Sequence, residues 1–324
     1  MQSKTSKKNP TINSLRYIND HKHFLVCTNQ DFRVYDSSSG EQKFISAVPG
    51  GVSLCDVYKN SNIFFFVGTG THTDYPTTKL CLWNIETHKL VGEVQFNMKL
   101  QIVDLYVKGS WILVVFKDRC KLFHFDLGFA APVKEFLTQP NSSHKSGQVA
   151  LHVTSDESEA IIAFADKEQK GRIQLYFFTG SDAQLRKEKA IFATDKQDVA
   201  GLSFSHDGQL LHVAVDNGKG LRVYTVQKRE LIKELARGYN PSHVNCIASD
   251  SNYMACCSDR KTVHIFNISS SVAQSQVLTE SQMGASEISE AQEEKKEPVK
   301  NTKSRLNMIS GYIPSYFSQE WSFS

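Results

Sequence analysis

Features of secreted and membrane-spanning proteins are missing from the sequence. The seven cysteines are odd in number and scattered, and no C-x-x-C pair occurs, so neither a disulfide framework nor a zinc site is indicated. The longest apolar runs, at 63–67 and 111–116, are far shorter than the roughly 20 residues that cross a bilayer. The start, MQSKTSKKNP, has no apolar segment typical of a signal peptide. We therefore expect an intracellular chain, cytosolic or nuclear.

Signals for catalysis and for cofactors are equally scarce. The lone glycine pair Gly68 and Gly70 is not followed by a helix, which a nucleotide cradle requires. His21 and His23 have no third metal ligand nearby, and neither G-x-S-x-G nor a Cys/His pair at recognisable spacing occurs. The formal net charge of +3 argues against broad coating by nucleic acid. We predict a protein that is not an enzyme and holds no metal or cofactor.

One pattern recurs along the chain: an alternating run that ends in an aromatic residue, often followed by Asp, Asn or Thr. Successive aromatic positions are 48, 40, 53, 48 and 42 residues apart. That spacing is about the length of a four-stranded propeller blade, and repeats of this period are typical of propellers. The six runs end at Tyr35, Trp83, Phe123, Tyr176, Tyr224 and Phe266.

The rest of each repeat fits a blade. A short apolar run precedes each aromatic run, and an amphipathic run follows it, as at 89–96 and 230–235. Asp207-Gly208 lies between two alternating segments, which is a strong hairpin signal. The alternative is a β-sandwich, but six near-equal units favour an all-β, WD40-like β-propeller of four-stranded antiparallel blades. The predicted blades span roughly 12–49, 50–97, 98–140, 148–195, 196–238 and 242–324.

Composition changes near the C-terminus. Ser, Gln, Glu and Lys dominate from about 269 to 301, with an acidic stretch at 287–297. Such a segment cannot bury a core, so we predict that 269–313 is a long, largely disordered loop within the sixth blade. Apolar residues return after 306. The whole chain, 1–324, is therefore predicted to be one propeller domain.

The sequence resembles the PROPPIN (WIPI) family of phosphoinositide-binding propellers. The resemblance rests on Leu231–Phe266 followed by a long loop and the run Tyr-Phe-Ser-Gln-Glu-Trp-Ser-Phe at 316–323, and on the stretches 75–83 and 119–123. It implies seven blades, of which six are visible, and binding of phosphatidylinositol 3-phosphate or 3,5-bisphosphate in autophagy. The sequence leaves three alternatives for the seventh blade: the chain is a fragment, it closes with six blades, or it borrows an edge from a partner.

The family has two lipid sites on either side of a Phe-Arg-Arg-Gly stretch. The matching stretch here reads Leu235-Ala236-Arg237-Gly238, so the first arginine is replaced. The first site's Ser, Thr and Arg correspond to Val215, Lys219 and Arg222. Val215 has no hydrogen-bonding group, and Lys219 lacks the fork geometry of arginine. The resemblance therefore implies a degenerate first site, with Arg222 as a weaker lipid ligand.

The second site matches the family better. Arg237 corresponds to the second arginine, and Ser258, Thr262 and His264 stand at matching positions of the sixth blade, with Cys257 where the family often has another Ser. Arginine offers a fork to phosphate, hydroxyls fill further acceptors, and histidine donates from either nitrogen. Alternation along a strand places Thr262 and His264 on one face. The alternative is an ordinary turn between blades with a solvated arginine.

In the family the sixth-blade loop inserts into the bilayer. Here Leu306, Met308 and Ile309 are the predicted membrane-contact residues, with nearby lysines facing anionic lipid. The acidic stretch at 287–297 opposes that attraction. The alternatives are a plain linker or the start of a closing strand.

Taken together, the resemblance implies a protein that binds a phosphoinositide-containing membrane and recruits autophagy proteins. A partner of the lipid-transfer type is expected on the second and third blades, about 74–107. The location implied is cytoplasmic and peripheral, on autophagosomal precursor, endosomal or vacuolar/lysosomal membranes. The alternative is a protein-interaction scaffold of the same fold that has largely lost lipid binding.

Overall fold

The structure is a computed structural model that describes residues 10–18, 21–59, 61–127, 131–140, 148–180, 183–193, 198–250, 252–269 and 299–300. These residues form β-strands joined by turns and by two short 3-10 helices, η1 (Phe125–Leu127) and η2 (Asp216–Gly218). Within these ranges, no helix has the length and apolar character needed to span a membrane. The chain divides into two compact units, Met1–His144 and Lys145–Ser324.

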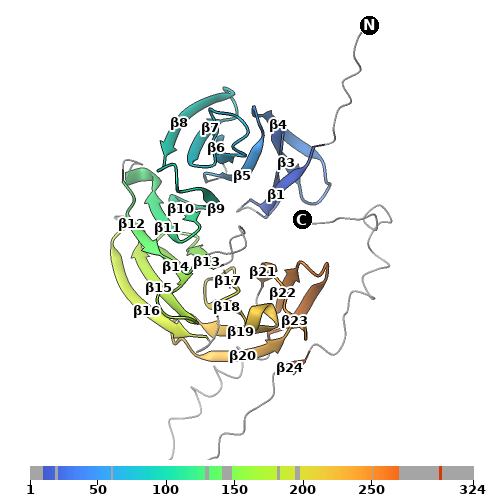
Figure 1. Ribbon diagram of the computed structural model, residues 1–324, viewed down its shortest axis with the longest axis vertical. Coiled ribbons are helices and arrows are strands. Elements are labelled where there is room, and N and C mark those ends of the chain that lie inside the picture. Colours follow the sequence, from blue (N-terminus) through green and yellow to red (C-terminus); the bar gives the residue numbers. More distant parts are fainter. Residues whose placement is uncertain are drawn as a thin grey trace, which may run out of the picture. The chain divides into compact units, whose positions relative to one another are not determined.

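The first unit holds three four-stranded antiparallel sheets, which we number blades 1 to 3 in chain order (Figure 1). In each blade the strands pair in sequence order, so every connection within a blade is a hairpin. Blade 1 is β1 (Ile12–Tyr17), β2 (His23–Thr28), β3 (Asp31–Asp36) and β4 (Gln42–Ala47). Blade 2 is β5 (Val52–Val57), β6 (Ile63–Gly68), β7 (Lys79–Asn84) and β8 (Lys89–Gln95). Blade 3 is β9 (Ile102–Lys108), β10 (Trp111–Phe116), β11 (Arg119–His124) and β12 (Lys134–Leu137).

The second unit holds blades 4 to 6, with the same meander order. Blade 4 is β13 (Val149–Val153), β14 (Glu159–Ala165), β15 (Arg172–Thr179) and β16 (Leu185–Phe192). Blade 5 is β17 (Gly201–Phe204), β18 (Leu210–Val215), β19 (Gly220–Thr225) and β20 (Leu231–Ala236), and the short β24 (Val299–Lys300) pairs in parallel with β20. The described part of blade 6 is β21 (Val244–Ser249), β22 (Tyr253–Ser258) and β23 (Val263–Asn267).

Position within the blade explains the sequence of each strand. The second strands β6, β10, β14 and β18 are buried on both faces along most of their length and read as nearly continuous apolar runs. In β22, by contrast, buried residues alternate with exposed or partly exposed ones. The fourth strands keep a polar side, as in β8, where exposed and partly buried residues alternate. The residues of the central strands are mainly β-branched or aromatic, which suits a pleated, packed surface.

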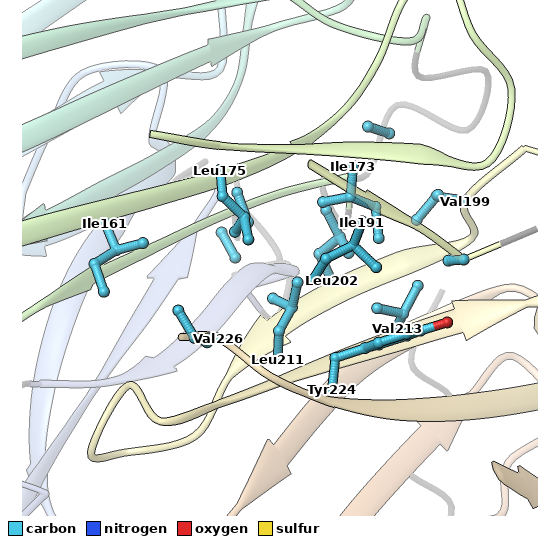
Figure 2. Packing of buried hydrophobic residues seen from close by; sticks show 14 of the residues in the cluster. Ile161, Ile173, Leu175, Ile191, Val199, Leu202, Leu211, Val213, Tyr224 and Val226 are labelled. Carbon is cyan, nitrogen blue, oxygen red and sulfur yellow. The ribbon is translucent and has the colours of Figure 1, made fainter. Parts of the chain in front are cut away.

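Neighbouring blades share cores within each unit. Figure 2 shows one such core, in which side chains of blade 4 face those of blade 5. Ile161, Leu175 and Ile191 pack with Leu211 and Val213, all of them buried. Interdigitated apolar side chains of this kind favour one relative placement of two sheets, because a displaced sheet leaves voids. The position of blade 5 against blade 4 therefore depends on these contacts.

A buried ionic cluster links the first strands of blades 1 to 3. Arg16 on β1 donates to the carboxylate of Asp104 and to the carbonyl of Leu105 on β9, and its guanidinium lies 3.8 Å from Asp56 on β5. Asp56 accepts a hydrogen bond from the backbone N–H of Val107 at 2.9 Å. Burial raises the pKa of Asp56 to about 6, despite the nearby arginine. One cation thus serves two carboxylates from different blades.

The predicted fold class is confirmed: the described chain is all-β and built from WD40-like propeller blades. The predictions of a single domain and of a disordered loop at 269–313 remain predictions, because 270–298 and 301–324 lie outside the described residues.

Candidate functional site

The candidate site lies where blade 5 passes into blade 6. Arg237 follows directly after β20, and its side chain is only 6 % exposed. The guanidinium Nε donates to the carbonyl of Gly218, and Nη2 donates to the carbonyl of Asn240 at 2.8 Å. Nη1 has no hydrogen bond to another described residue. Since arginine carries five N–H donors, further donors remain for an acceptor outside the protein.

The carbonyl of Gly218 is presented by an unusual turn. Asp216, Asn217 and Gly218 all have positive φ, at 52°, 51° and 77°. Only glycine adopts this region without strain, and Asn and Asp tolerate it better than most residues. A Cβ added at Gly218 would lie 2.1 Å from the carbonyl oxygen of Ser242. The turn therefore packs directly against the segment that enters blade 6.

The other side of the site comes from β22 and β23. Cys256 and His264 are direct partners across the two strands, and Cys256 belongs to the core shared with blade 5. Because side chains alternate, Ser258 and His264 lie on this same face. Ser258 is buried, His264 is partly buried, and the exposed Thr262 hydroxyl lies 3.2 Å from His264 Nε2. The predicted placement of Thr262 and His264 on one side is confirmed.

Electrostatics connect the two sides. Partial burial lowers the pKa of His264 below its ordinary value of 6.5, and the positive charge of Arg237 lowers it further. The imidazole is therefore held neutral near pH 7. An anion placed between Arg237 and His264 would act against both effects and raise the pKa of His264, since a negative charge favours the imidazolium.

Part of this surface was not predicted from the sequence. Arg260 and Lys261 are exposed on the β22–β23 turn, two residues from Thr262 or closer. Arg260 Nη2 donates to the carbonyl of Pro241 at 3.1 Å. Ser242 donates to Asp259 at 2.5 Å, which lowers the pKa of that carboxyl. The signal was the charged turn Asp-Arg-Lys between two strands, and its place beside Arg237 depends on the fold.

Residues of the degenerate first site are engaged elsewhere. Arg222 and Glu234 are partners in the β19–β20 register, and Arg222 Nη2 lies 2.7 Å from Glu234 Oε1. Arg222 Nη1 also donates to the carbonyl of Ala193. Val215 is buried, and Lys219 lies 3.9 Å from Asp216. The contacts with Glu234 and with the carbonyl of Ala193 leave Arg222 much less free than the sequence suggested.

Two further predictions from the sequence concern Cys257 and the membrane-contact residues. Cys257 follows Cys256 on β22, so its side chain lies on the face of the sheet opposite to Ser258 and His264. The predicted membrane-contact residues Leu306, Met308 and Ile309 lie outside the described residues. Among the described residues, no group of three or more His, Cys, Asp or Glu side chains is placed to hold a metal.

The fold and a family model agree on the class of protein. The model "WD domain, G-beta repeat" matches residues 230–267, which run from the last strand of blade 5 through β23. The chain is a WD40-like β-propeller protein.

The chain is also similar in sequence to individual proteins of known name. SVP1-like protein 2 of Pichia angusta is 25% identical over 320 residues, covering 97% of this chain and 80% of the relative. Autophagy-related protein 18e of Arabidopsis thaliana is 27% identical over 250 residues, covering 76% of this chain and 63% of the relative.

Solved structures share the fold. Kluyveromyces lactis Hsv2 has a TM-score of 0.65 at 16% identity, over 80% of this chain and 75% of that one. A complex of KlAtg21 with the coiled coil of AgAtg16 has a TM-score of 0.63 at 18% identity, over 79% of this chain and 81% of that one. The chain is thus similar in sequence to proteins named SVP1-like and autophagy-related, and it shares its fold with Hsv2 and KlAtg21, in line with the resemblance to the PROPPIN family. Propellers of this family are generally not enzymes.

Proposed function

We propose that the chain binds the phosphorylated headgroup of a 3-phosphoinositide at the junction of blades 5 and 6 and recruits autophagy proteins to that membrane. The observation that carries the proposal is the convergence of a buried arginine, a hydroxyl and an imidazole. The charge of Arg237 lowers the pKa of His264, and the Thr262 hydroxyl lies 3.2 Å from His264 Nε2. Arg260 and Lys261 add exposed positive charge beside them. Phosphate oxygens suit all of these donors.

In the resulting arrangement each residue has a distinct role. Arg237 supplies a fixed charge, since its guanidinium is held by the carbonyls of Gly218 and Asn240. Thr262 and His264 donate to the phosphate, while Ser258 shapes the floor of the site. Arg222 remains a weaker candidate, because an anion would have to compete with Glu234. Contact of Leu306, Met308 and Ile309 with lipid is part of the proposal, and so is a peripheral location on autophagosomal, endosomal or vacuolar/lysosomal membranes.

The test is flotation of the full chain with liposomes. The lipids compared are phosphatidylcholine alone, with phosphatidylinositol, with phosphatidylinositol 3-phosphate and with the 3,5-bisphosphate. We expect flotation only with the phosphorylated lipids, and about tenfold weaker binding for Thr262→Val or His264→Leu, which corresponds to one lost hydrogen bond to a charged group. Val263→Thr is the matched control, because Val263 is exposed on the other side of β23. Equal binding by all three variants would refute the site.

A second candidate function is a scaffold that binds proteins without lipid. It is favoured by the lack of available phosphate-binding donors at the predicted first site. Val215 and Ala236 offer no side-chain donor, and Arg222 is paired with Glu234. One solved neighbour is a complex with a coiled coil, so a coiled-coil autophagy protein is one partner class to test, beside a lipid-transfer type of partner on blades 2 and 3. Failure of a folded chain to float with any phosphoinositide, together with capture of such a partner, would favour the scaffold.

A further inference from the structure

Blade 6 has one packed face and one open face among the residues described. Ile247, Met254, Cys256 and Phe266 are buried against blade 5. The opposite face carries exposed Val263 and Ile265, at 43 % and 40 % exposure. Two cysteines share this open face, and none of the seven cysteines, all of which are among the described residues, is in a disulfide.

These two cysteines, Cys246 on β21 and Cys257 on β22, are direct partners in the antiparallel register. Residues directly opposite in such a pair have Cα atoms about 4.5–5.5 Å apart, which falls inside the 4.4–6.8 Å range that a disulfide requires. The two thiols are hydrogen-bonded to each other. Cys246 is exposed and Cys257 is partly exposed. Closure of an S–S bond therefore needs rotation of side chains and no large movement of the strands.

The local environment favours the reactive form of Cys257. The hydrogen bond from Cys246 lowers the pKa of the Cys257 thiol to about 6, against the effect of partial burial. Burial raises the pKa of Cys27 too, but hydrogen bonds from Cys55 and Ser14 outweigh it and lower that pKa. The pKa values of several other cysteines shift in the opposite direction. Burial raises the pKa of Cys81 and of Cys256 to about 12, and it also raises the pKa of Cys120.

A second thiol pair in the chain serves as an internal comparison. Cys27 and Cys55 also contact each other, but their exposed fractions are 1% and 2%. Burial raises the pKa of Cys55. A reagent in solution reaches the first pair and not the second while the protein is folded.

We propose that Cys246 and Cys257 form a reactive dithiol, a modification site that small disulfide oxidants such as glutathione disulfide close to a cross-strand disulfide. In the first step the Cys257 thiolate attacks one sulfur of the oxidant. The oxidant's S–S bond breaks, and one glutathione leaves and takes up a proton. Cys246 then loses its proton and attacks the Cys257 sulfur, which expels the second glutathione. Two protein thiols and one disulfide become one protein disulfide and two glutathione molecules.

The pair lies apart from the candidate lipid site. Its thiols face away from Ser258 and His264, although Cys257 and Ser258 are adjacent in the chain. The proposal consequently stands whether or not the site at Arg237 binds lipid. The same two thiols would also bind trivalent arsenic, which prefers adjacent pairs of soft sulfur ligands.

The experiment treats the full, reduced chain with glutathione disulfide at pH 7 and then with N-ethylmaleimide, followed by intact mass and peptide mapping. Without oxidant we expect two maleimides per folded chain. With oxidant we expect none, a mass lower by two hydrogen atoms, and a peptide that joins Cys246 to Cys257. Cys256→Ala is the matched control, because Cys256 is the chain neighbour of Cys257 on the packed face. It should still form the bridge.

Several results would overturn the proposal. One is two stable glutathione adducts without a bridge, and another is a bridge to Cys256 or to a second chain. Unchanged reactivity at Cys257 in Cys246→Ala, which has no donor at this position, would contradict the thiol contact. Phenylarsine oxide gives an independent measurement: it should bind one to one to the wild-type chain and lose that binding in Cys246→Ser and in Cys257→Ser. The peptide map of the wild-type chain does not depend on the folding of any variant.

Discussion

The Arg237 guanidinium donates to the carbonyl of Gly218, so the residue assigned to anion binding also closes the turn after β18. A second hydrogen bond reaches Asn240, in the segment that leads into blade 6. Arg237 is therefore a structural residue as well as a source of charge. Substitutions at this position test both roles at once, and the two have to be separated.

We expect Arg237→Ala to lower the free energy of unfolding by about 1–3 kcal/mol, since the buried carbonyl of Gly218 loses its donor, whereas the carbonyl of the exposed Asn240 can be hydrated. Urea unfolding of the two proteins measures the difference. Arg237→Lys keeps the charge without the fork, so it should fall between wild type and Arg237→Ala. A loss below about 0.5 kcal/mol in Arg237→Ala would show that the carbonyls find water instead.

Lipid binding should depend on pH through His264. Burial and Arg237 lower the pKa of His264 in the free protein, whereas a bound phosphate raises it. Affinity should therefore be flat above the bound-state pKa and rise as pH falls from about 7 to below the ordinary 6.5, by about fivefold. Flotation with phosphatidylinositol 3-phosphate at pH 5.5–7.5 provides the measurement.

The lipid phosphate also titrates in this range, so the control is His264→Gln. This variant retains a donor and cannot become charged, and its profile reports the lipid alone. Wild-type and His264→Gln profiles that run parallel would exclude a protonated His264 from the bound state.

Gly218→Ala should disturb the site through the backbone. The added Cβ meets the Ser242 carbonyl at 2.1 Å, and the φ of +77° is strained for alanine by about 1–2 kcal/mol. Gly40→Ala is the matched control, because Gly40 has a φ of +70° and no atom within 4 Å of the added Cβ. We expect Gly40→Ala to cost only the strain and Gly218→Ala to cost clearly more. Equal losses in urea unfolding would mean that the turn moves away from Ser242 freely.

Removal of Arg16 should leave two buried carboxylates without their cation. We expect Arg16→Met to destabilise the protein by about 3–5 kcal/mol at pH 7. Arg119 also bridges two carboxylates, Asp118 and Glu135, but these are exposed, so Arg119→Met should cost about 1 kcal/mol or less.

The cost of Arg16→Met should also depend on pH. Without the arginine, the folded-state pKa of Asp56 rises further above the unfolded value near 3.9, so protonation of Asp56 favours the folded chain. The difference from wild type should therefore shrink as pH falls from 7 toward 4. A loss independent of pH would indicate that packing of the arginine stem, rather than its charge, is responsible.

Local sequence was enough to predict the blades. Strand alternation, the aromatic ends near 45-residue intervals and the Asp207-Gly208 turn are short-range signals, because each depends on residues that are neighbours in one hairpin. The pairing of Thr262 with His264 was predictable for the same reason: they are two residues apart on one strand face.

Long-range packing set the chemistry of individual side chains. Arg222 is drawn to Glu234 by the register of β19 and β20, and Arg237 is anchored by a carbonyl 19 residues away. Cys257 matches a family serine in sequence, yet it faces Cys246 because a third strand, β21, pairs with β22. The choice of these partners follows from strand register and burial, which composition and spacing do not specify.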